Sequence, residues 1–176
     1  MKHRILLSVL LSFVLFVGGC GYTTSSNLSS RFRTVYVEDF KNKITYSSAS
    51  GKDIYIPLLE VKSRNAVIDR FLFDGNLRIA EAQAADLVLK GELKSYQRDG
   101  LRVTDNDDVL EYRVRIIVRF TLWDTRMQEV VWEESSFAGE ATYFVTGAEA
   151  TSEDAAIEEA IVDLARRVVE RTIENW

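Results

Sequence analysis

The chain has 176 residues, a formal net charge of −5, one cysteine and one histidine. The histidine is His3, inside a hydrophobic leader, so the rest of the chain offers no imidazole for acid–base catalysis or metal ligation. The single cysteine excludes an internal disulfide and zinc sites of the Cys/His type. The acidic balance disfavours general binding of nucleic acid, which depends on surplus lysine and arginine. We therefore expect no enzyme activity, metal or cofactor.

The N-terminus is typical of a bacterial lipoprotein signal. A positively charged start at residues 1–4 precedes an apolar run over residues 5–17, which is shorter than the roughly 20 residues that a membrane-spanning helix needs. Two glycines and then Cys20 follow this run. We predict a signal peptide over residues 1–19 and lipidation (palmitate) of Cys20, which anchors the chain to a membrane. The alternative is an ordinary secretory signal with an incidental cysteine.

A small, polar segment separates the leader from the rest of the chain. Residues 20–33 are expected to form a lipidated tether, because residues 21–30 lack the apolar content to pack. Ten extended residues reach at most ~35 Å, so the folded part should stay near the membrane surface. We predict one domain over residues 34–176, with no internal repeat.

The first half of that domain predicts a strand, a loop, a helix and a short strand. Thr34–Phe40 is rich in β-branched and aromatic residues and predicts the first strand. Residues 41–56 are polar, with serines at their centre, and predict a loop. Pro57 suits the first turn of a helix that ends near Asp74. The short strand is predicted over residues 77–79. The apolar stripe expected on the helix consists of Leu58, Val61, Ile68, Phe71 and Leu72.

Three longer strands and a helix follow. The strands are predicted over Asp86–Arg98, Val109–Asp124 and Glu129–Ala141, with a bulge between Trp132 and Phe137, where the alternation of the last strand slips. The middle strand places Tyr112, Val114, Ile116, Val118, Phe120 and Leu122 on one face, and Arg113, Arg115, Ile117 and Arg119 on the other.

The final helix has the strongest pattern in the chain. Residues 151–154 indicate a capping box at its start. Its predicted buried stripe consists of Ile157, Ala160, Ile161, Leu164, Ala165, Val168 and Val169. The fold class is therefore α+β: a mostly antiparallel or mixed sheet of four to five strands, with two helices packed on one face.

Several segments, taken together in order, resemble one known family. They are residues 20–22, 34–40, 85–91, 111–114, 131–133, 141–145 and 165–170. The chain resembles the lipopolysaccharide-assembly lipoprotein family (LptE-like) over residues 20–176, although residues 41–56 are longer and richer in serine than the pattern. The resemblance implies a lipid-anchored protein on the periplasmic side of the outer membrane of a Gram-negative envelope. It also implies a plug and assembly partner of an LptD-type β-barrel during lipopolysaccharide transport.

Arginines on the polar face of the middle strand indicate a phosphate site, because guanidinium groups pair bidentately with phosphate. We predict that Arg113, Arg115 and Arg119, with Lys90 and Lys94, contact the phosphates of lipopolysaccharide. Arg98 extends this strip if its strand is a neighbour. The alternative is a solvated face on which Glu92, Glu111 and Glu133 are cross-strand partners.

Two further questions stay open at this level. Residues 143–145 (Tyr-Phe-Val) either contact the barrel or cap the core. The function that competes with lipopolysaccharide assembly is a regulatory lipoprotein that binds and activates a cell-wall synthase. A hydrolase that uses two carboxylates is a third hypothesis, but the sequence shows no cleft for it.

Overall fold

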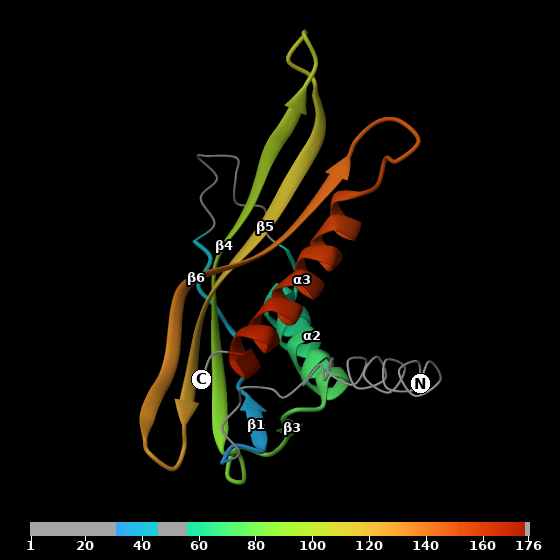
Figure 1. The fold of residues 1–176 in the computed structure, drawn as a ribbon. Helices are drawn as coiled ribbons and strands as arrows, with labels where there is room; N and C mark the ends of the chain where they lie inside the picture. Colours follow the sequence, from blue (N-terminus) through green and yellow to red (C-terminus); the bar gives the residue numbers. More distant parts are fainter. Residues whose placement is uncertain (1–30, 46–55, 175–176) are drawn as a thin grey trace, which may run out of the picture.

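The computed structural model describes residues 31–45 and 56–174. The predicted signal peptide, Cys20 and most of the predicted tether lie outside the described residues. Phe32, at the end of that tether, is buried in the core. The elements are β1 (Thr34–Val37), β2 (Lys41–Asn42), α2 (Leu59–Asp74), β3 (Arg78–Ile79), β4 (Leu87–Val103), β5 (Val109–Asp124), β6 (Glu129–Phe144) and α3 (Glu153–Glu174) (Figure 1).

The strands form one mixed sheet that both helices cover on the same side (Figure 1). The strand order is β3-β1-β4-β5-β6, and β2 pairs with β4 beyond the end of β1. β1 runs parallel to β3 and β4, whereas β4, β5 and β6 are antiparallel neighbours. The predicted α+β class is confirmed. The predicted loop over residues 41–56 is corrected at its start, where Lys41 and Asn42 form β2.

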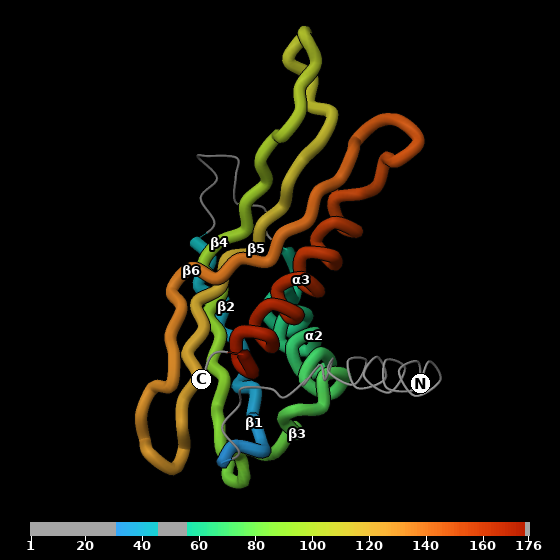
Figure 2. The backbone as a smooth tube through the Cα atoms, in the orientation of Figure 1, coloured from blue at the N-terminus to red at the C-terminus, as the bar shows by residue number. Residues whose placement is uncertain are grey.

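The β4–β5 hairpin is longer than the sequence predicts. β4 continues to Val103, so the hairpin extends past the start of α3 (Figure 2). β6 is also longer than predicted and ends at Phe144. We call residues 99–111 of this hairpin the distal arm. Both strands of the arm remain paired up to Val103 and Val109, with register shifts near Leu101. The arm therefore projects beyond the layer of helices.

Bulges decide which side chains face the helices. In β6, Glu134 and Phe137 are partners of Phe120 and Val118, so β6 carries an extra residue between them. This confirms the predicted bulge. A second bulge at Lys94 in β4 was not predicted, and it reverses the alternation, because Leu93 and Tyr96 are both buried.

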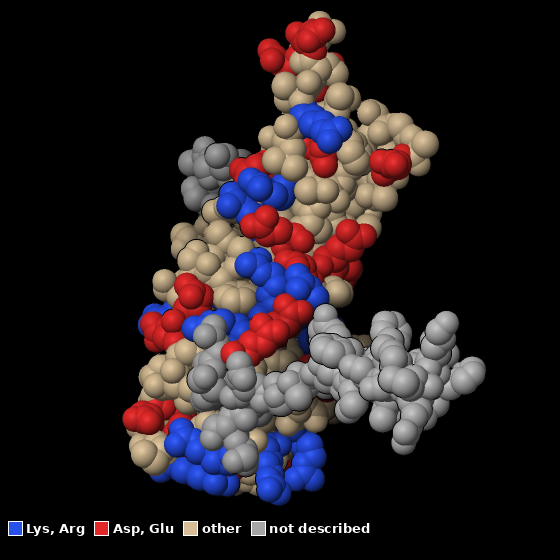
Figure 3. Space-filling model, in the orientation of Figure 1, with Lys and Arg blue, Asp and Glu red and all other residues tan. Residues whose placement is uncertain are grey.

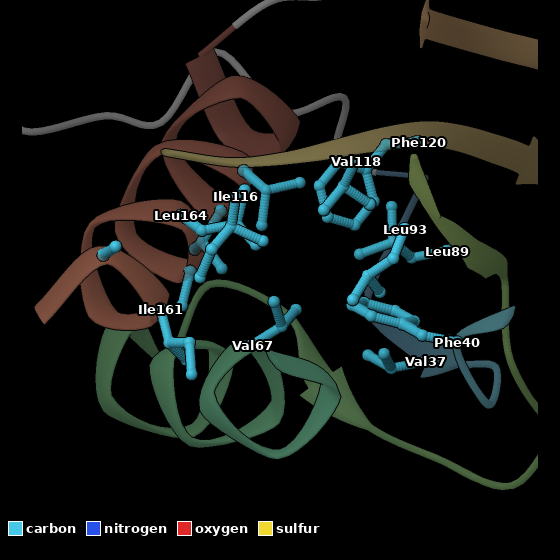
Figure 4. Packing of buried hydrophobic residues seen from close by; sticks show 14 of the residues in the cluster. Val37, Phe40, Val67, Leu89, Leu93, Ile116, Val118, Phe120, Ile161 and Leu164 are labelled. Atoms are coloured by element: carbon cyan, nitrogen blue, oxygen red, sulfur yellow. The ribbon is translucent and has the colours of Figure 1, made fainter. Parts of the chain in front are cut away.

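The core lies between the sheet and the two helices (Figure 4). The apolar face predicted for β5 is confirmed: Val114, Ile116, Val118, Phe120 and Leu122 are fully buried, and Tyr112 packs against them. An aromatic cluster fills the lower sheet, where the Phe120 ring meets the Phe40 and Phe137 rings edge-on, at 5.5 and 5.7 Å between centroids. Phe40 fits there because Gly91 has no side chain; a Cβ at Gly91 would lie 2.6 Å from the ring.

α3 packs closely on the sheet. Every residue of its predicted apolar stripe is buried. The predicted cap is corrected by one position, since the Ser152 hydroxyl accepts the Ala155 N–H at 3.1 Å and the helix begins at Glu153.

α2 differs more from the prediction. It begins at Leu59, because Leu58 adopts a left-handed conformation (φ 58°) and cannot continue the helix. Its buried residues are Leu59, Ser63, Val67 and Phe71, so of the predicted stripe only Phe71 is buried in the core. Leu58, Val61 and Leu72 are exposed. The predicted stripe was wrong because the buried side of α2 contains a serine while apolar residues occupy its exposed side.

The helix-to-sheet distance at Gly139 gives the first testable prediction. A Cβ there would lie 2.3 Å from the carbonyl oxygen of Ala160 and 2.5 Å from the Cβ of Leu164. Gly139→Ala should lower the free energy of unfolding by about 2–3 kcal/mol, because α3 must move away from β6. Urea unfolding measures this change.

Gly100→Ala is the matched control, because its Cβ would meet only the side chain of Val109, at 3.3 Å. It should change the free energy of unfolding by less than about 1 kcal/mol. Equal effects of the two substitutions would contradict the close packing of α3 on β6.

Candidate functional site

The face of β4, β5 and β6 that is turned away from the helices carries the predicted basic residues. We call it the outer face. Arg113, Arg115 and Arg119 lie along β5, and Lys90 and Lys94 lie on the neighbouring β4. The arginines are half-buried and the two lysines are exposed. The structure therefore brings all five predicted residues to one face, as the alternation of β5 indicates.

Each arginine on this face has a carboxylate partner. Arg115 contacts Asp99 at 2.8 Å, Arg119 contacts Glu133 at 2.6 Å, and Arg113 lies 4.0 Å from Glu140. These pairs join neighbouring strands, and at this exposure each is worth at most about 1 kcal/mol. The arginines are held in place but stay within reach of solvent.

The two lysines are held differently. Lys94 lies 3.2 Å from Glu92 on its own strand, and the Lys90 ammonium lies 5.6 Å from the centre of the Trp123 ring. Of the predicted acidic partners, Glu133 does pair across strands, with Arg119. Glu111 also pairs across strands, with Arg102 at 2.9 Å, and it is buried although the alternation of β5 places it on the same face as Arg113.

A shallow hollow of about 210 Å³ lies on the outer face beside the break between β1 and β2. Its lining residues are Glu38, Lys41, Lys90, Gly91, Glu92, Arg119 and Thr121. We call it the outer hollow. The hydrogen bond from Lys94, followed by the nearby charges of Lys94, Arg119 and Lys41, lowers the pKa of Glu92. Three cations thus converge on a hollow that also contains two carboxylates.

Lys41 is the cation of this hollow that the sequence missed. It reaches the hollow because β2 pairs in parallel with β4, with Lys41 opposite Glu92. A two-residue strand inside a serine-rich segment gives no periodic signal, so the sequence could not have indicated this position.

Arg98 does not belong to the outer face, contrary to prediction. The bulge at Lys94 turns Arg98 toward the helices, where it pairs with Glu153 and lies over the Tyr112 ring. Glu153 also accepts the Tyr96 hydroxyl at 2.7 Å and the Tyr143 hydroxyl at 3.3 Å. We call this group the Glu153 cluster. It joins the base of the distal arm to the first turn of α3, where a carboxylate suits the helix dipole.

Burial raises the pKa of Tyr96 and of Tyr143, and the Glu153 carboxylate adds to both effects. Both hydroxyls therefore stay protonated as donors. Tyr143 is 5% exposed and stacks on Tyr112, so within residues 143–145 it belongs to the core, while Val145 is exposed.

A second polar cluster lies at the opposite end of the sheet. Asp86 accepts the backbone N–H groups of Arg33 and Thr34, at 2.8 and 3.1 Å, and pairs with Arg126. Asp124, 1% exposed in its side chain, pairs with Arg31 at 2.9 Å. These carboxylates fix the start of β1 and the β5–β6 turn to the start of β4.

Asp86 gives a pH-dependent prediction. Burial alone would raise its pKa, but the hydrogen bonds from Arg33 and Thr34 and the charge of Arg126 lower the pKa below its ordinary value of 3.8. The stabilisation that the Asp86 carboxylate gives to the folded state is therefore fully present above pH 3.8. It is lost as the pH falls through the lower pKa that Asp86 has in the folded state. Asp86→Asn should cost about 1–3 kcal/mol at pH 7. Thermal unfolding at a series of pH values should show that the difference in stability between Asp86→Asn and wild type narrows below about pH 4.

Glu81→Gln provides the control, because Glu81 is exposed on the adjoining turn. It should leave the free energy of unfolding nearly unchanged at every pH. A gap between Asp86→Asn and wild type that stays constant down to strongly acid pH would contradict the assigned role of the carboxylate.

Among residues 31–45 and 56–174, no group of three His, Cys, Asp or Glu side chains is placed to hold a metal ion. Within the same ranges, no helix combines the length and apolar content needed to cross a bilayer.

Comparison with known proteins identifies the family. The sequence model of the LptE family, described as lipopolysaccharide-assembly, matches residues 32–172. The match covers nearly the whole folded domain, and the chain belongs to this family. It is thus a lipoprotein of the lipopolysaccharide-assembly type. A search of curated proteins finds no match.

Solved structures share the fold at low sequence identity. Protein XCC0632 from Xanthomonas campestris has 13% identity and a TM-score of 0.56, with 82% of this chain and 88% of that chain covered. The hypothetical protein CT253 from Chlamydia trachomatis has 14% identity and a TM-score of 0.52, with 80% and 95% covered. The PelC dodecamer from Paraburkholderia phytofirmans has 17% identity and a TM-score of 0.50, with 86% and 96% covered. At these identities the likeness shows the fold alone.

Proposed function

We propose that this protein is a non-enzymatic lipoprotein of the outer membrane, anchored through an acylated Cys20, that acts as plug and assembly partner of an LptD-type β-barrel. In this role it aids the insertion of lipopolysaccharide into the outer leaflet. The observation that carries the proposal is the match of the lipopolysaccharide-assembly family to residues 32–172.

The organisation of the domain supports a role in binding. Two helices close one face of the sheet, so that face contributes to stability and is not open to a partner. The outer face and the distal arm stay accessible. Leu101 and Val103 on the arm and Val145 beside it are 43%, 58% and 40% exposed, so this region offers apolar side chains to a partner.

The outer hollow is the part of the basic strip best suited to a phosphate of lipopolysaccharide. Lys41, Lys90 and Arg119 line it, and the lysine ammonium groups are mobile point charges that can follow a ligand. Arg113 and Arg115 lie further along β5, each opposite a carboxylate. We infer that the strip of Arg113, Arg115, Arg119, Lys90 and Lys94 attracts the anionic headgroup and that the hollow is where a phosphate binds.

The proposed partnership predicts co-purification. After mild detergent extraction, the tagged protein should be recovered in stable, equimolar association with a large outer-membrane β-barrel, because a plug contacts its barrel over a wide surface. Mass spectrometry of the purified complex identifies the partner. Recovery with no barrel would count heavily against the proposal, and crosslinking to a cell-wall synthase would favour the regulatory alternative.

The proposed phosphate contacts predict the effect of charge reversal. Arg115→Glu combined with Arg119→Glu should lower the affinity for lipopolysaccharide by about tenfold or more, since two charge-assisted contacts are lost. The fold should remain, because both arginines are partly exposed. Binding is measured at low salt, and circular dichroism checks the fold.

Lys62→Glu combined with Arg166→Glu is the matched control. Both residues are exposed, ion-paired cations, but they lie on the helices, so the charge change is the same and the face is different. Unchanged affinity in the outer-face variant, or an equal loss in both, would mean that the strip is ordinary charged surface.

A further inference from the structure

Arginine side chains gather at the end of the domain where β1 begins. Arg31 and Arg33 precede β1, Arg78 lies opposite Thr34 in β3, and Arg126 lies in the β5–β6 turn. Hydrogen bonds to backbone carbonyls link them in pairs. The Arg78 N–H donates to the Arg33 carbonyl at 2.9 Å, and the Arg126 guanidinium donates to the Arg31 carbonyl at 3.5 Å. All four are exposed. We call this group the arginine end; lysine and arginine side chains dominate this lower end in Figure 3.

The carboxylates at this end lie behind the arginines. Asp86 and Asp124 pair with Arg126 and Arg31, and both are buried, at 8% and 1% exposure. Within the described part of the chain, no carboxylate forms an ion pair with Arg33 or Arg78. The exposed acids nearby are Glu81, on the adjoining turn, and Glu129, which begins β6 opposite Asp124. The outward charge of this end is therefore carried mainly by guanidinium groups.

Exposed apolar side chains flank these arginines. Met127 follows Arg126 in the same turn and is 59% exposed. Phe73 ends α2 shortly before Arg78 and, at 81%, has the highest exposed fraction among the exposed large apolar side chains of the described residues. Cations beside exposed apolar side chains are typical of surfaces that contact the headgroup region of a bilayer.

The opposite end of the domain carries the opposite charge. The turn at the tip of the distal arm contains Asp105, Asp107 and Asp108, all exposed, and acidic side chains gather at this tip in Figure 3. The molecule therefore has a charge polarity along its long axis. Near an anionic membrane the arginine end is attracted and the tip is repelled.

We propose that the arginine end binds the headgroups of anionic phospholipids and so holds the domain with its distal arm pointing away from the bilayer. Charge and chain length both point to phospholipid headgroups as the ligand. Only residues 21–30 separate Cys20 from Arg31, and ten residues reach at most ~35 Å, so a membrane-held N-terminus keeps this end near the lipid surface. The inference rests on the proposed acylation of Cys20 and describes the protein before it meets the proposed β-barrel, so it does not depend on that partner.

Fluorescence quenching in vesicles tests the orientation. The full-length protein is reconstituted into vesicles of phosphatidylglycerol and phosphatidylcholine that contain a lipid with a nitroxide headgroup. A fluorescent amino acid replaces Met127 in one sample and Asp107 in another. Quenching should be several-fold stronger at position 127 than at position 107. It should fall toward the value at position 107 in about 0.5 M NaCl, where charges are screened beyond a few ångströms, and in vesicles of phosphatidylcholine alone.

Charge variants separate specific contact from simple tethering. Arg33→Glu combined with Arg78→Glu should abolish the difference in quenching between the two positions. Lys62→Glu combined with Arg166→Glu carries the same charge change on the helices, away from this end, and should leave the difference intact. Thermal unfolding confirms that each variant is folded. Equal quenching at both positions in wild type, or quenching at position 127 that neither salt nor the Arg33/Arg78 variant reduces, overturns the proposal.

Discussion

The structure depends on the burial of one sheet face under two helices. The central strand β5 supplies fully buried residues from Val114 to Leu122, and α3 approaches the sheet so closely that β6 has room only for a glycine at position 139. Burial of this apolar face under the helices is the main favourable contribution to folding. The outer face is left to charged side chains, which neighbouring strands arrange in pairs. One-sided burial thus determines both the stability of the domain and the position of its accessible surfaces.

Two polar clusters define the ends of this packed unit. The Asp86 and Asp124 carboxylates tie β1 and the β5–β6 turn to β4 at one end, and the Glu153 cluster ties the base of the distal arm to α3 at the other. Beyond Glu153 the arm consists of two paired strands that no helix covers (Figure 1). A polar sheet end beside the N-terminal segment, a charged outer face and a projecting arm suit a protein that works by contact with lipid and with other proteins.

Much of the fold could be predicted because its main elements follow simple periods. The alternation in β5 and the three-to-four spacing in α3 are nearly uninterrupted, so strand, helix and buried face were correct. The buried face predicted for α2 was wrong, because Ser63 is buried and Leu72 is exposed. The position of Arg98 was wrong because a single extra residue, Lys94, reverses every side chain after it. Lys41 was missed because long-range pairing with β4, rather than local pattern, makes it part of a strand. The five basic residues predicted for the outer face do share it, but their binding of phosphate stays a prediction.

Amide hydrogen exchange under native conditions tests the claim of a one-sided core most directly. The amides of β5 from Val114 to Leu122, together with those of α3 from Ala160 to Val168, should exchange only through global unfolding and so share the slowest rates. The amides of the distal arm, residues 99–111, should exchange much faster, because no helix covers them. Arm amides as slow as those of β5, or an α3 that opens well before β5, would contradict the account.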